Sequence, residues 1–248
     1  MVSIHSVRRV FFWHALDLSR LGMLLSKAAT AKSKALAANC RRVEDYVDLA
    51  LNFRWGLYPF QIHMKPAQVK DEILKLTSLL DDLKPRAVLE IGTGGGGTLF
   101  LWSRVASADA TIISIDLPGG PFGGGYPKWK MPFYESFAKS RQRVYLLRGD
   151  SHDSATFRNV KRILGACQLD FLYIDGDHSY EGVKKDFEMH SPLVRKGGII
   201  AFHDIVPHSS ESGCEVSRFW NQVKDSYKQL EIVKDQNQKR AGIGLLFI

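Results

Sequence analysis

The chain has 248 residues, of which 45% are hydrophobic and 24% are charged, a composition typical of a soluble globular protein. This excludes collagen, coiled-coil and wholly disordered chains, and the length is sufficient to bury a core without disulfides. The formal net charge is +8, but residues 1–42 contain eight basic residues and one acidic residue, so nearly all of the excess lies there. The basic character therefore says little about what the rest of the chain binds.

The three cysteines indicate a reducing compartment. The chain has an odd number of cysteines, and they are widely spaced, at Cys40, Cys167 and Cys214. They therefore fit neither a set of paired disulfides nor a CxxC zinc site. We therefore expect a cytoplasmic protein. The longest apolar runs, such as residues 10–16 and 169–174, are far shorter than the roughly 20 residues that cross a bilayer, so we expect no transmembrane segment.

Residues 1–55 are predicted to form a basic amphipathic helical extension, followed by the main domain at 56–248. Apolar residues recur at helical spacing from Val7 to Leu25, and no proline occurs before Pro59. Charged residues interrupt the apolar run, which argues against a secretory signal peptide. We expect the extension to pack on its own domain or on a second subunit, forming a homo-oligomer, and weak contact with a membrane surface is the alternative.

The rest of the chain alternates between helical and β-rich segments. After a break at residues 56–66, a helix with Pro66 near its first turn precedes five β-rich runs, at residues 87–91, 111–115, 143–147, 169–174 and 198–202. This alternation predicts a mostly parallel sheet with helices on both faces. Two further runs, 230–234 and 243–248, are joined by a connection too short for a crossover helix, so they should pair antiparallel.

A glycine-rich loop follows the first of these strands. Glycines let the chain turn sharply and bring backbone N–H groups close to a ligand. Gly92, Gly94 and Gly97 satisfy the dinucleotide pattern GxGxxG. The ExGxGxG pattern of S-adenosylmethionine binding is satisfied as well, by Glu90 with Gly92, Gly94 and Gly96. A tight turn without a ligand is the remaining alternative.

Two acidic residues follow the next two strands. Asp116 ends the second strand, 24 residues after Gly92, at the height where a carboxylate accepts both ribose hydroxyls. Asp150 follows the third strand, where it would accept from an adenine amino group or, alternatively, cap a loop or a helix. Because the carboxyl ends of parallel strands meet at one edge, we expect these residues to line one ligand site.

The fourth and fifth strands end in acids and histidines. Asp175, Asp177 and His178 follow the fourth strand, and His203 and Asp204 end the fifth. These strands should be neighbours, so the side chains converge. Oxygen ligands with one imidazole suit a divalent ion such as Mg²⁺ or Mn²⁺. Asp177 is expected to cap the following helix.

Together these motifs resemble the class I S-adenosylmethionine-dependent methyltransferases. The similarity covers about residues 60–248 and runs through VLEIGTGGGGT, SIDL, RGDS, LDFLYIDGDH, GGIIAFHD and the terminal hairpin. Within that class the chain resembles the small-molecule O-methyltransferases that include macrolide-sugar methyltransferases and cephalosporin-hydroxylase-like proteins. The resemblance implies a Rossmann-like, doubly wound α/β fold with a seven-stranded sheet whose last strand is antiparallel.

The resemblance also implies a role for each site residue. The methionine part of S-adenosylmethionine would be held by Glu90, Gly92, Thr93, Gly94 and Gly96. Asp116 would hold the ribose, and Asp150 and Ser151 would hold the adenine end. Asp175 would lie beside the transferred methyl group. A divalent metal on Asp175, His203 and Asp204 would chelate hydroxyls of the acceptor, and His178 would act as the catalytic base or, alternatively, have a purely structural role. His203 departs from the relatives, which tend to have an acid there.

The sequence therefore predicts an S-adenosylmethionine-dependent methyltransferase acting on a hydroxyl of a small molecule, such as a sugar or another natural product. An NAD-type oxidoreductase is the first alternative, against which Glu90 and the terminal hairpin count. A non-catalytic binding protein on the same fold is the second. Nucleic acid is not expected as a partner, because the positive charge lies in the extension. The loop at 118–127, with the aromatics after it, is expected either to close over the acceptor or to be ordinary structure.

Overall fold

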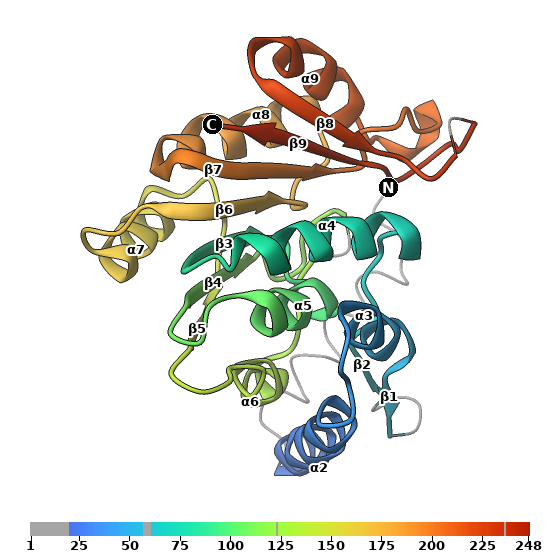
Figure 1. Cartoon of the computed structure of the whole chain (residues 1–248), viewed down its shortest axis with the longest axis vertical. Coiled ribbons are helices and arrows are strands. Elements are labelled where there is room, and N and C mark those ends of the chain that lie inside the picture. Colours follow the sequence, from blue (N-terminus) through green and yellow to red (C-terminus); the bar gives the residue numbers. More distant parts are fainter. Residues whose placement is uncertain (1–19, 57–60, 123, 236) are drawn as a thin grey trace.

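The computed structural model describes residues 20–56, 61–122, 124–235 and 237–248. A seven-stranded sheet lies at the centre of these residues, with helices on both of its faces (Figure 1). The strands are β1 Arg54–Trp55, β2 Ile62–His63, β3 Ala87–Ile91, β4 Thr111–Asp116, β5 Arg143–Arg148, β6 Leu169–Ile174, β7 Val194–His203, β8 Lys228–Ile232 and β9 Ile243–Phe247. The α-helices are α2 Arg20–Ala37, α3 Val43–Asn52, α4 Lys70–Leu83, α5 Gly97–Val105, α6 Met131–Glu135, α7 Ser154–Leu164, α8 Tyr180–His190 and α9 Val216–Val223.

The strand order of the large sheet is β5-β4-β3-β6-β7-β9-β8. Strands β3 to β7 pair in parallel, whereas β9 lies between β7 and β8 and is antiparallel to both. The predicted Rossmann-like sheet and its antiparallel last strand are therefore confirmed. The strands lie close to their predicted positions, but β7 begins at Val194 instead of residue 198, and β8 begins at Lys228 instead of residue 230. The order reverses beside β3, so the carboxyl ends of β3, β4 and β6 surround one crevice.

Both faces of the sheet are buried, which explains why its central strands read as continuous apolar runs. Neighbouring residues of β3 point to opposite faces: Val88 packs in one core with α3, α4 and α5, and Leu89 packs in the other with α7, α8 and α9. Each face of the sheet therefore has its own hydrophobic core. A ligand site has to form where the strands end, outside these two cores.

The described part of the N-terminal extension forms two helices joined by a turn, as Figure 1 shows. Helix α3 contributes Val47 and Ala50 to the core that also holds α4 and α5, whereas α2 leaves Leu21, Met23 and Leu24 exposed. Residues 1–19, which include the first part of the predicted amphipathic face, lie outside the described residues. The domain boundary at residue 55 stays a prediction.

The segment before α4 differs from the prediction. Helix α4 begins at Lys70, so Pro66 is not in its first turn, and the expected break contains the two-residue strand β2, which pairs with β1. Pro66 instead packs against the glycine loop, because a Cβ added to Gly97 would lie 2.6 Å from its Cδ. Segment 62–69 therefore covers the loop. No helix in the described ranges has the length and hydropathy needed to span a bilayer.

Candidate functional site

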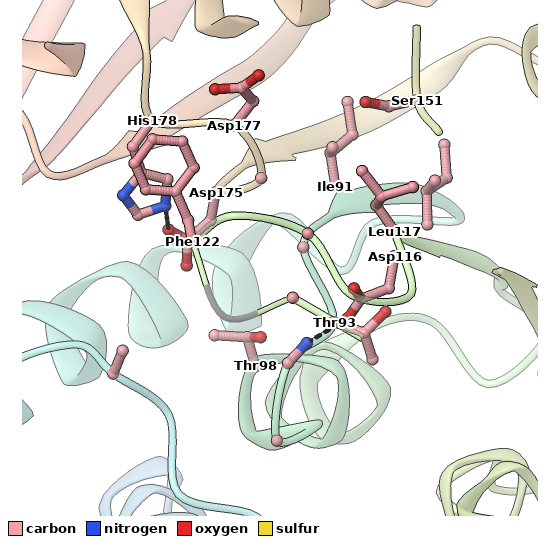
Figure 2. A pocket seen from close by; sticks show the side chains of 18 of the residues that line it. Ile91, Thr93, Thr98, Asp116, Leu117, Phe122, Ser151, Asp175, Asp177 and His178 are labelled. Carbon is pink, nitrogen blue, oxygen red and sulfur yellow. Dashed lines mark hydrogen bonds and ion pairs between the residues drawn. The ribbon is translucent and has the colours of Figure 1, made fainter. Parts of the chain in front are cut away.

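A cavity of about 340 Å³ opens at the carboxyl ends of β3, β4, β5 and β6. Figure 2 shows side chains from these strand ends and from the 118–127 loop converging around it. Its lining includes most of the residues predicted to bind a cofactor, namely Gly92, Thr93, Gly94, Asp116, Asp150, Ser151 and Asp175. Two predicted residues, Glu90 and Gly96, do not line it.

The glycine loop, residues 92–97, is held tightly between two segments. Gly92 and Gly96 have φ values of +99° and +79°, a region that side chains rarely adopt. A Cβ on Gly92 would overlap the carbonyl oxygen of Asp175, and one on Gly97 would overlap that of Met64. These positions therefore require glycine, which leaves the loop N–H groups close to the cavity.

Asp116 ties the glycine loop to the loop at 118–127. Its Oδ2 accepts a hydrogen bond from the Gly94 N–H at 2.7 Å, and its Oδ1 accepts one from the Gly125 N–H at 2.5 Å. Burial raises the pKa of Asp116 to about 6, although these N–H groups stabilise the carboxylate. The predicted ribose ligand thus stands at the end of β4, where it also lines the cavity.

Glu90 lies behind the glycine loop and is fully buried. It accepts hydrogen bonds from Trp102 Nε1 at 2.9 Å and from Ser114 Oγ at 2.5 Å, and Ser114 Oγ in turn lies 2.6 Å from Thr93 Oγ1. Burial raises the pKa of Glu90 to about 7. The carboxyl group therefore supports the loop from within the protein, and its predicted contact with the cofactor stays a prediction.

Asp150 closes a loop, as expected, and its predicted contact with adenine stays a prediction. The carboxylate lines the cavity and also accepts the His152 N–H at 2.8 Å, which closes the turn after β5. His152 Nε2 lies 3.1 Å from the buried carboxylate of Asp186, a contact that raises the pKa of His152. The adenine end of the predicted site is thus braced by an ion pair that the sequence did not suggest.

A histidine–aspartate cluster, consisting of Asp175, His178, His203, Asp204 and His208, lies at the ends of β6 and β7. His178 Nδ1 is 3.1 Å from Asp204 Oδ2, and its Nε2 is 3.4 Å from Asp175 Oδ1. His203 Nδ1 is 3.1 Å from Asp175 Oδ1. Burial lowers the pKa of His178, but its hydrogen bonds to the two carboxylates outweigh this and raise the pKa to about 12. For the same reason the pKa of His203 rises to about 10.

The cluster has the donor chemistry of a divalent-cation site. One ligand atom from each of Asp175, His203 and Asp204 lies within 4.8 Å of the others, and the same holds for His178, Asp204 and Cys214. His203 Nε2 is buried without a hydrogen-bond partner among the described residues. Carboxylate oxygens with imidazole nitrogens fit Mn²⁺ and similar ions, and the carboxylates alone fit Mg²⁺.

His208 of the cluster and three residues around it were not predicted as site residues from the sequence. His208 Nε2 lies 3.1 Å from Asp204 Oδ1, and Gln68 Nε2 donates to Asp175 Oδ2 at 2.7 Å. Cys214 joins one of the candidate ligand groups. The Phe122 ring stacks on the His178 ring, with centroids 5.0 Å apart (Figure 2). The position of His208, four residues after Asp204, was a usable signal, whereas the others come from distant segments.

Two smaller expectations are refined. The prediction that Asp177 caps α8 is wrong: the N-cap is Ser179, whose Oγ accepts the Gly182 N–H, and Asp177 accepts the Ser179 N–H just before the helix. Tyr126, within the 118–127 loop, and Trp129 and Tyr134, after it, are core residues with 4% exposure or less. Phe122 is therefore the aromatic side chain of this region that lines the cavity.

Comparison with known proteins supports the same fold. Residues 89–205, from β3 to the end of β7, match a family described as a methyltransferase domain. The O-methyltransferase TomG from Streptomyces achromogenes, solved with S-adenosylmethionine, has a TM-score of 0.54 at 15% identity, covering 89% of this chain and 96% of that chain. An O-methyltransferase from Bacillus cereus has a TM-score of 0.53 at 16% identity, covering 90% and 100%. MycE, from mycinamycin biosynthesis, has a TM-score of 0.52 at 16% identity, covering 84% and 54%.

Two curated relatives carry no functional description. An uncharacterized protein of Sinorhizobium fredii is 27% identical over 175 residues, which cover 68% of this chain and 18% of that protein. An uncharacterized protein of Acanthamoeba polyphaga mimivirus is 41% identical over 125 residues, covering 50% and 52%. The chain thus spans about half or less of the length of these relatives. Residues 89–205 are thus similar to a methyltransferase domain, and the described part of the chain shares the fold of solved O-methyltransferases such as TomG.

Proposed function

We propose that this protein transfers a methyl group from S-adenosylmethionine to a hydroxyl oxygen of a small molecule, with the help of a divalent metal. The observation that carries the proposal is the cavity in which the glycine loop and Asp116 lie together with Asp175 and His178, the two members of the histidine–aspartate cluster that line it. The neighbours TomG and MycE support it, because they were solved with S-adenosylmethionine and with Mg and S-adenosylhomocysteine, respectively.

The reaction is an in-line displacement, so the protein mainly positions the acceptor hydroxyl and removes its proton. Asp175, His203 and Asp204 would hold the cation, which supplies a lower pKa for a coordinated hydroxyl. His178 lies between the two carboxylates and is placed to take that proton. The neutral ring that a base requires is favoured when Asp175 and Asp204 engage a cation instead of His178.

The cofactor is tested first, by titration calorimetry with S-adenosylmethionine and with NAD. We expect saturable binding of S-adenosylmethionine and none of NAD. Formation of S-adenosylhomocysteine is then measured with a set of hydroxylated small molecules. A protein that binds NAD but not S-adenosylmethionine would overturn the proposal.

The metal is tested separately, with chelator-treated protein and added Mg²⁺ or Mn²⁺. We expect turnover to fall in excess chelator and to recover with one of these ions, and we expect Asp175→Asn and Asp204→Asn to lose the recovery. Direct metal binding, measured by calorimetry, provides a readout that is independent of turnover. Full activity in excess chelator would remove the metal from the proposal.

We also propose that the protein is a cytoplasmic homo-oligomer, most simply a dimer. Free thiols at Cys40, Cys167 and Cys214 support the location, and the exposed Leu21 and Leu24 on α2 support the assembly. The double substitution Leu21→Ser and Leu24→Ser should reduce the mass measured by light scattering. An unchanged mass would count against assembly through α2.

A further inference from the structure

A second hollow, which we call the basic groove, adjoins the cofactor cavity. Its cationic side chains are Arg54 of β1, Lys65, and Arg240 from the β8–β9 connection, and the ring of His63 of β2 lies among them. None of the nine described residues that line it is acidic. The groove thus joins the region from β1 to Val69 with the β8–β9 connection, which is far away in the sequence, and both regions contribute positive charge.

The cations of the basic groove have no polar side-chain partner among the residues that the structure describes: the side chains of Arg54, Lys65 and Arg240 form no ion pair or hydrogen bond with any of them. Arg54 and His63 are directly opposed in the β1–β2 pair, so their side chains share one face. Partial burial lowers the pKa of His63, and the charges of Lys130, Arg54 and Lys65 lower it further, which shows that these charges converge.

The basic groove is continuous with the cofactor cavity. Lys65, Pro66, Ala67 and Gln68 line both hollows. His63 rests against the glycine loop, because a Cβ added to Gly95 would lie 3.4 Å from its Nδ1. A small molecule in the groove would therefore extend directly toward the cofactor.

Gln68 provides a second, independent sign of a ligand. It is 5% exposed, and its Nε2 donates a hydrogen bond to Asp175 Oδ2. This bond orients the amide so that its carbonyl oxygen points away from Asp175. The carbonyl oxygen Oε1 is buried and has no hydrogen-bond partner among the described residues. A buried acceptor without a donor is costly, so this atom is suited to a hydroxyl donor supplied by a ligand.

We propose that the basic groove binds an anionic group of the methyl acceptor, a carboxylate or a phosphate, while Gln68 accepts a hydrogen bond from the hydroxyl group that lies beside Asp175. The inference rests on the proposed methyl transfer and narrows its acceptor to small hydroxylated anions. Arg54 and Arg240 bind the charge, Lys65 lies between them and the cofactor cavity, and Gln68 sets the orientation.

The test uses the full chain saturated with S-adenosylhomocysteine, at constant ionic strength because salt screens exposed charges. Inorganic phosphate, D-glucuronate and neutral D-glucose are titrated separately, and the signal is the NMR shift of the His63 ring. We expect saturable shifts with an anion and binding at least tenfold tighter for D-glucuronate than for D-glucose. Whichever of phosphate and D-glucuronate binds with the higher affinity identifies the preferred type of anion. Shifts that do not saturate, or equal affinity for D-glucose, would overturn the inference.

Variants assign the effect to the groove. The pair Arg54→Gln and Arg240→Gln should weaken anion binding at least fivefold, and Lys65→Gln provides a second variant if the pair is unstable. Arg143→Gln is the matched control, because Arg143 is an exposed arginine at the start of β5, away from the groove. If the double variant bound the anion as tightly as the wild type, the inference would be wrong.

The same samples separate this inference from the proposed function. S-adenosylmethionine binding is measured by calorimetry on each of them. Protein that binds the cofactor but neither anion would refute the anionic acceptor and leave methyl transfer intact. Protein that binds the anion but not the cofactor would refute methyl transfer instead.

Discussion

The two sides of the cavity, which we call the cofactor side and the acceptor side after the proposed function, are built in different ways. On the cofactor side, the glycine loop, Asp116 and Asp150 directly follow β3, β4 and β5, and hydrogen bonds within this stretch hold them in place. On the acceptor side, the residues come from the β1–β2 pair, the segment before α4, the 118–127 loop and the β8–β9 connection. Strand ends thus fix a cofactor site locally, whereas the acceptor site depends on how distant segments meet.

The difference predicts that chemistry and cofactor binding can be separated by substitution, and the largest effect is expected at His178. Since its task is proton transfer in the transition state, His178→Ala should lower turnover by roughly 10² to 10⁴. S-adenosylmethionine affinity should remain nearly unchanged, because the loop and Asp116 are intact. Turnover is followed as S-adenosylhomocysteine production. Near wild-type turnover would remove His178 from the chemistry, and lost cofactor affinity would show that the two sides are not independent.

The next effect concerns the stability of the cofactor side. Burial raises the pKa of Glu90 from 4.5 to about 7, so the folded protein retains a proton that the unfolded chain releases between these pH values. The free energy of unfolding should therefore fall as pH rises from about 4.5 to about 7, by on the order of 3 kcal/mol, and this contribution should then stay constant. Glu90→Gln has no proton to release in this pH range and keeps an acceptor for Trp102, while its amide would donate to Ser114 Oγ, which can donate to Thr93 Oγ1 instead. This variant should not lose stability between these pH values.

Urea unfolding at a series of pH values measures that effect as the difference between wild type and variant. The matched control is Glu188→Gln, at an exposed position on α8, which should leave the pH dependence unchanged. A Glu90→Gln variant that is less stable than the wild type at pH 8 would contradict the prediction. It would mean that the ionised carboxylate, rather than the protonated form, stabilises the glycine loop.

Asp116 tests whether the cofactor side depends on its charge. Asp116→Ala leaves the ribose hydroxyls without their acceptor, at a cost of about 1.5 to 3 kcal/mol, so S-adenosylmethionine should bind roughly tenfold or more weakly. The pKa of Asp116 is raised to about 6, and a protonated carboxyl cannot accept from both hydroxyls. Wild-type affinity should therefore fall as pH drops below 6, by about tenfold at pH 5. An unchanged affinity in calorimetry would remove Asp116 from the site.

The same contrast explains how much the sequence could predict. The sheet, its antiparallel last strand and the convergence of Asp116 with Asp175 follow from strand ends, since parallel strands present their carboxyl ends at one edge. By contrast, β1 pairs with β2 across a loop, and Gln68 contacts Asp175, which lies more than 100 residues further along the chain. No local sequence pattern predicts such contacts. The position of Glu90 behind the glycine loop was also not predicted. A motif gives a residue's position along the chain but not the direction of its side chain.

The smallest expected effect concerns Phe122, which joins the 118–127 loop to the acceptor side. Its ring is stacked on His178 with an interplanar angle of 12°, and 38% of the residue is exposed. Aromatic stacking contributes about 0.5 to 1.5 kcal/mol, so Phe122→Ala should lower turnover by roughly three- to tenfold if the stack orients the base. Phe122→Tyr retains the ring and should keep most of the activity. Equal loss of turnover in both variants would show that Phe122 acts through the conformation of the 118–127 loop rather than through His178. The acceptor side would then depend on local structure, as the cofactor side does.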